Sequence, residues 1–174
     1  MSLPTPAPTR PFSRGSHFAD VEAAQAALRL TLPMLEAQLQ MPEVCGSGFL
    51  HVVVMDPALG PEDAAFDDAV LLEHSVGDRT RWDADYAAFA RSKAALSWRY
   101  GCSGHELQAM APHRLRSGDS LLRGAVVLDG IVVAVSGAHA PWDEAFATTI
   151  AACLRAVAQQ RWQAARDLGR LAAD

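Results

Sequence analysis

Six histidines and three cysteines are the side chains of this 174-residue sequence whose chemistry best suits catalysis or metal binding. The histidines contain no HExxH or HxH pattern, and the cysteines contain no CxxC or CxxCH motif. These absences exclude the common zinc signatures and covalent c-type haem attachment. Position selects His74, which ends a predicted strand, and His139, which follows another. Both imidazoles lie at one end of the sheet if those strands are neighbours and run alike, although surface or hydrogen-bonded histidines are the simpler alternative.

Cys102 and His105 form a weaker candidate pair, separated by two residues in a segment without regular periodicity. A nearby imidazole can lower the pKa of a thiol and generate a nucleophilic thiolate. A nucleophilic cysteine also needs an oxyanion hole and an orienting group, and a zinc site needs two more ligands. The pair is therefore an alternative to a structural thiol. Whether the protein is an enzyme stays open, and a conventional enzyme is the less favoured interpretation.

Arginines gather in two short stretches of the chain. An arginine fork can bind carboxylates in pairs, such as haem propionates or those of a small acid, while a solvated surface is the plain alternative. The two clusters are Arg79, Arg81 and Arg91, and Arg114, Arg116 and Arg123.

Composition limits the classes of partner. Fifteen Lys and Arg against twenty Asp and Glu give a net charge of −5, which provides no general attraction for nucleic acid or anionic lipid. We therefore expect no nucleic-acid and no membrane partner. The odd number of cysteines, the absence of asparagine and an N-terminus without the apolar run of a secretory signal favour reduced thiols in the cytoplasm.

The hydrophobic pattern predicts one α+β domain. The proline-rich residues 1–16 are expected to form a flexible arm, and residues 17–174 a single domain. Asp129-Gly130 between two β-branched runs is typical of a hairpin with a type I′ turn. Pro33 is expected to end or kink the first helix. The predicted helices cover 18–32, 82–99 and a stretch from about 141, and the predicted strands cover 49–55, 70–76, 122–128 and 131–135.

Several motifs in the second half occur in the order typical of a known group. A leucine and a histidine precede a glycine turn, aspartates head a helix with a basic centre, and a Val-Ser-Gly strand end leads to an aspartate. The residues concerned are Leu72, His74, Asp83, Asp85, Lys93, Glu106, Leu107, Val135, Ser136, Gly137 and Asp143. Over roughly residues 70–160 the chain thereby resembles the GlcG/HbpS-like superfamily, the haem-degrading-domain or DUF336 group. Within that group it is most similar to the UPF0303 branch.

The resemblance implies a profilin-like antiparallel sheet of about five strands with helices packed on its faces. It also implies assembly into homo-oligomers and, in some members, haem binding; haem degradation rests on the resemblance alone. His74 is then the first candidate to face the haem iron, with His139 behind it. Arg91 and Lys93 are the candidate partners of anionic groups.

We therefore expect a cytoplasmic, homo-oligomeric protein that binds haem or a similar small planar or anionic ligand. The alternative is an assembly or adaptor subunit without a cofactor. That alternative is based on Trp142 and Trp162, which lie off the apolar stripe of the last predicted helix and are suited to burial against a neighbouring subunit.

Overall fold

The core of the protein is an antiparallel sheet of four strands in the order β2-β1-β4-β3. The computed structural model describes residues 15–169, so nearly all of the expected N-terminal arm lies outside the described residues. The strands are β1 Leu50–Met55, β2 Val70–Val76, β3 Ala125–Leu128 and β4 Ile131–Ser136. The α+β class is confirmed. The expected count of about five strands is one too high for the described residues, because the remaining segments are helical or irregular.

The β3–β4 hairpin has the geometry that its sequence predicts. Val126 pairs with Val133 in antiparallel register. Both turn residues have positive φ, 50° for Asp129 and 84° for Gly130, as a type I′ turn requires. The first hairpin strand begins at Ala125 rather than at residue 122, because Gly124 has φ +126° and interrupts the extended chain.

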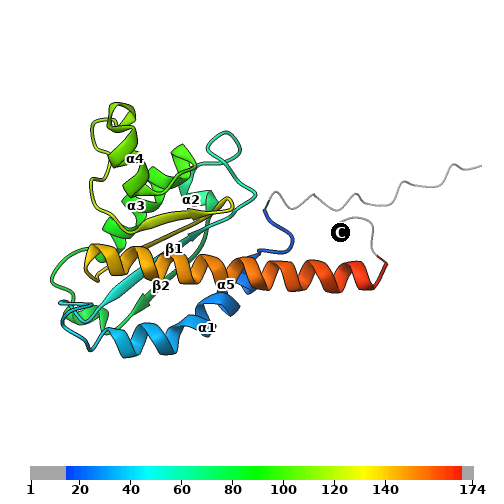
Figure 1. Ribbon diagram of the computed structural model, residues 1–174, viewed down its shortest axis with the longest axis horizontal. Helices are drawn as coiled ribbons and strands as arrows, with labels where there is room; N and C mark the ends of the chain where they lie inside the picture. Colours follow the sequence, from blue (N-terminus) through cyan, green and yellow to red (C-terminus); the bar gives the residue numbers. More distant parts are fainter. Residues whose placement is uncertain (1–14, 170–174) are drawn as a thin grey trace, which may run out of the picture.

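Helices cover both faces of the sheet (Figure 1). The helices α1 Val21–Gln38 and α5 Ala140–Asp167 lie on one face, and α3 Tyr86–Tyr100 lies on the other. Side chains along β1 alternate between the two layers: Val52 and Val54 belong to the α1–α5 core, and Val53 belongs to the α3 core. All six residues of β1 are buried as a result.

Capping aspartates mark the starts of two of the long helices. Asp20 accepts a hydrogen bond from Ala23 N at the start of α1, and Asp85 does the same for Ala88 N at the start of α3. Of the two effects expected of Pro33, an end or a kink of the first helix, the end does not occur, because α1 continues to Gln38. Proline removes one backbone donor, and the burial of Leu35 in the turn that follows compensates for it.

Four short helical segments complete the fold. These are α2 Phe66–Ala69, the 3-10 turn η1 Arg79–Arg81, α4 Gly104–Met110 and the 3-10 turn η2 Pro112–Arg114. A capping box between Ser103 and Glu106 starts α4. Among residues 15–169, no helix combines the length and the apolar character needed to cross a membrane.

Most of the polar side chains discussed below lie at one end of the sheet. There β1 begins, β2 and β4 end, and Gly137 turns the chain into α5; we call this the Gly137 end (at the left in Figure 1). Gly137 has φ +137°, and a Cβ there would lie 2.1 Å from Phe49 O, so only glycine allows this close approach. β2 and β4 run in the same direction, as the histidine hypothesis assumed, but β1 separates them.

Candidate functional site

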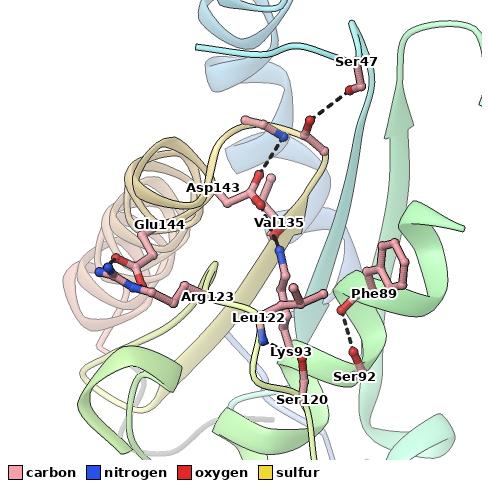
Figure 2. A network of polar contacts seen from close by, with 12 residues as sticks. Ser47, Phe89, Ser92, Lys93, Ser120, Leu122, Arg123, Val135, Asp143 and Glu144 are labelled. Carbon is pink, nitrogen blue, oxygen red and sulfur yellow. Dashed lines mark hydrogen bonds and ion pairs between the residues drawn. The ribbon is translucent and has the colours of Figure 1, made fainter. Parts of the chain in front are cut away.

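A buried ion pair joins α3 to the start of α5 at the Gly137 end (Figure 2). Lys93 Nζ donates to Asp143 Oδ2 at 2.8 Å and to Val135 O at 3.0 Å. Each of the two charged side chains is only 3% exposed. Asp143 Oδ1 accepts a hydrogen bond from Ala138 N at 2.9 Å, so both carboxylate oxygens have partners.

Burial dominates the protonation of the Asp143 carboxyl. Desolvation raises the pKa of Asp143 from 3.8 to about 6, although Lys93 and the amides of Ala138 and Gly137 favour the charged form. Gly124 leaves the room that the pair occupies, because a Cβ there would lie 2.9 Å from Lys93 Nζ and 2.7 Å from Asp143 Cβ. Through its hydrogen bonds the buried pair therefore connects α3, β4 and α5.

A second ionic contact lies beside the pair at the surface. Arg123 donates to both carboxylate oxygens of Glu144, at 3.1 and 2.8 Å (Figure 2). His105 Nδ1 lies 3.2 Å from Glu144 Oε1. Burial raises the pKa of the Cys102 thiol, which disfavours the thiolate that a nucleophile needs. Within the described chain, His105 has Glu144 rather than Cys102 as its ionic partner.

His51 lies in the middle of another polar cluster at this end. Its side chain is 4% exposed and faces the α3 layer from β1. Nδ1 lies 2.9 Å from Ser75 Oγ, and Nε2 lies 3.6 Å from Glu73 Oε2. Burial lowers the pKa of this imidazole, with Glu73 opposing the effect. The Trp82 ring contacts the imidazole edge to face, with ring centroids 5.9 Å apart.

Two arginines cover aromatic rings next to His51. Arg79 lies over Trp82, with its guanidinium carbon 4.7 Å from the ring centroid, and Arg81 lies 5.9 Å from the centroid of Phe49. Both side chains are exposed, and neither forms an ion pair with a carboxylate of residues 15–169. Tyr86 also contacts Trp82 edge to face, at a centroid distance of 5.5 Å. The guanidinium groups are thus held in place by rings rather than by acidic partners.

The residues selected from the sequence occupy separate places. His74 is half-buried on β2 opposite Val52, so it faces the α1–α5 layer. His139 precedes α5, and its Nε2 lies 3.1 Å from Pro42 O.

The two basic residues selected from the sequence already have acidic partners. Arg91 is bonded to Glu73 and Asp67, and Lys93 is bonded to Asp143. No group of three or more His, Cys, Asp or Glu side chains in the described chain is arranged to hold a metal ion.

Sequence reasoning did not select His51. The only signal was a histidine within the β-branched run that forms β1, and alternation alone does not show which face it occupies or which residues lie opposite it. The pairing of His51 with Ser75 and the position of Trp82 depend on the β1–β2 register.

An apolar groove of about 300 Å³ lies at the opposite end of the sheet. It is lined by Phe18, Ala19, Pro57, Ile131, Arg155, Ala158, Gln159 and Trp162. Trp162 therefore lies near Ile131, at the hairpin end of β4. It contains none of the residues selected as ligands from the sequence.

Comparison with known proteins identifies the fold. No family model matches the chain, and no curated protein matches it. The solved structure of ORFY from Klebsiella pneumoniae, described by the family model DUF336, is similar with a TM-score of 0.53 and 16% identity, over 78% of this chain and 90% of that one. The structure of HbpS is similar with a TM-score of 0.51 and 19% identity, over 86% and 97%. The chain therefore has the fold of the GlcG/HbpS-like DUF336 proteins.

Proposed function

We propose that the protein is a homo-oligomeric member of this superfamily, closest to the UPF0303 branch, which binds a small planar or anionic ligand in the cytoplasm. The observation that carries the proposal is the pair of exposed guanidinium groups of Arg79 and Arg81, held over aromatic rings without a carboxylate partner among residues 15–169. Such groups are ready to bind the carboxylates of a ligand. The fold and the sequence resemblance support the same assignment.

Haem is the first ligand to test, because some members of the group that the sequence resembles bind it. His74 is half-buried, and neither of its ring nitrogens forms a hydrogen bond within the described chain, so it is the proposed iron-facing side chain. Arg79 and Arg81 are the proposed partners of the propionates. His139, Arg91 and Lys93 are secondary candidates, because each would have to give up the partner that it has in the structure.

Titration of the purified protein with haemin, followed by the Soret band, tests this proposal. We expect a saturable shift that is lost in His74→Ala. His113→Ala is the matched control, because His113 is an exposed histidine on η2, and this variant should bind like the unchanged protein. A titration without a saturable shift, or a shift that His74→Ala leaves unchanged, would remove haem from the proposal.

The second candidate function is an assembly or adaptor subunit without a cofactor. Two exposed tryptophans on α5 favour it: Trp142 is 40% exposed and Trp162 is 45% exposed. Exposed aromatic side chains are common at protein interfaces. Analytical ultracentrifugation at micromolar concentration should show an oligomer, and Trp142→Ser or Trp162→Ser should weaken it. A strict monomer would contradict both this function and the homo-oligomer in the first proposal.

A further inference from the structure

Two buried ring nitrogens in the cluster around His51 have no hydrogen-bond partner within the described chain. They are His51 Nε2 and Trp82 Nε1. They belong to rings in edge-to-face contact, and the His51 side chain is 4% exposed. Buried polar groups are normally paired, so each of these nitrogens leaves an unmade hydrogen bond in the protein alone.

Both nitrogens are suited to donate a hydrogen bond. The indole nitrogen of Trp82 is always a donor. His51 Nδ1 can accept from the Ser75 hydroxyl at 2.9 Å, which leaves the proton on Nε2. Glu73 Oε2, 3.6 Å from Nε2, favours the same tautomer. Both nitrogens therefore lack an acceptor within hydrogen-bond distance, and Glu73 Oε2 at 3.6 Å from His51 Nε2 lies just beyond it.

The surrounding charges favour an anionic acceptor. The guanidinium of Arg79 lies over the Trp82 ring and forms no ion pair with residues 15–169. Glu73 is the nearest negative charge, and Arg91, which is bonded to its other oxygen, offsets it. His74, on the opposite face of β2, and Arg81, over Phe49, are the other titratable or cationic groups nearby.

We propose that His51, Trp82 and Arg79 together form a binding site for the carboxylate group of the ligand. This inference rests on the proposed function and makes it more specific, because it assigns the anionic end of the ligand to three named side chains. Trp82 covers His51 and follows η1 in the connection between β2 and α3. Binding therefore requires the indole ring to shift enough to admit two oxygens.

Acetate is the probe for this site, observed through the indole N–H signals of the uniformly ¹⁵N-labelled full-length protein. Trp82→Phe identifies the signal of Trp82 among the four tryptophans. We expect this signal to move saturably with sodium acetate and not with sodium chloride at equal ionic strength. Arg79→Gln should weaken acetate binding by about tenfold or more, because it removes a charge-assisted contact.

Arg29→Gln is the matched control, since Arg29 is an exposed arginine on α1, which covers the opposite face of the sheet from His51. It should leave acetate affinity within about twofold of the unchanged protein. Equal responses to acetate and chloride, or equal losses in the two arginine variants, would overturn the site. Acetate binding without haemin binding would refute haem as the ligand and support this carboxylate site. Haemin binding without an acetate response would support haem and refute this carboxylate site.

Discussion

Lys93 and Asp143, fifty positions apart, form an enclosed ion pair with an Nζ–Oδ2 distance of 2.8 Å. The lysine also donates to Val135 O, and the aspartate accepts from Ala138 N. The pair thus connects α3, the end of β4 and the start of α5. Because both side chains are withdrawn from water, each depends on the other for its charge compensation.

Replacing one partner of this pair is expected to be strongly destabilising. Lys93→Met should lower the free energy of unfolding by about 3–5 kcal/mol, because it leaves the Asp143 carboxylate buried without its counter-ion. Urea denaturation measures the change. Arg155→Met is the control: its partially exposed ion pair with Asp129 should be worth about 1 kcal/mol or less. Equal costs for the two variants would show that the buried pair contributes no more than a surface contact.

The stability that Asp143 contributes should fall as the pH rises from about 4 to about 6. Its pKa is raised in the folded state from 3.8 to about 6, so within this window the folded protein holds a proton that the unfolded chain releases. The difference in unfolding free energy between the unchanged protein and Asp143→Asn should decrease by up to about 3 kcal/mol across the window. Denaturation at a series of pH values measures this, and an increasing difference would contradict the raised pKa.

Gly124→Ala should destabilise the protein more than Gly118→Ala. Both glycines have positive φ, so both substitutions carry a strain of about 1–2 kcal/mol. Only at Gly124 would the new Cβ meet other atoms, with Val135 O at 2.6 Å, whereas nothing lies within 4 Å at Gly118. We expect an additional cost of about 1–3 kcal/mol from this overpacking. Thermal unfolding of the two variants compares them directly, and equal melting temperatures would contradict the close contact.

Cys102 should react slowly with iodoacetamide. Burial raises the pKa of its thiol, so less thiolate is present near neutral pH. Mass spectrometry of the labelled peptides, with glutathione as the reference thiol, measures the rate. Labelling of Cys102 faster than that of glutathione would restore the hypothesis of an activated nucleophile.

Local patterns were sufficient to predict most of the fold. Asp129-Gly130 predicted the hairpin because that dipeptide tolerates the positive φ of its turn. Aspartates at helix starts and apolar spacing located the three long helices. Pro33 does not end α1, because burial of Leu35 in the following turn, a tertiary effect, outweighs the loss of one backbone donor.

The arrangement of the candidate site depends on contacts between distant segments. Lys93 was selected for its charge, but its partner Asp143 is determined by the approach of α5 to α3. The environment of His51 depends on the register that places Ser75 opposite it. Single-sequence patterns contain neither relationship, so they identified residue types at the Gly137 end without identifying which of them meet.

The helix α5 has two parts that differ in how they contact the rest of the protein. All of its buried residues lie between Asp143 and Leu154, although the helix continues to Asp167 and projects beyond the sheet (Figure 1). Arg161, which contacts Asp20 and Glu22 at the start of α1, tethers the projecting part. Backbone amides after Leu154 should therefore exchange with deuterium through local fraying, while those before it should exchange only when the whole domain opens.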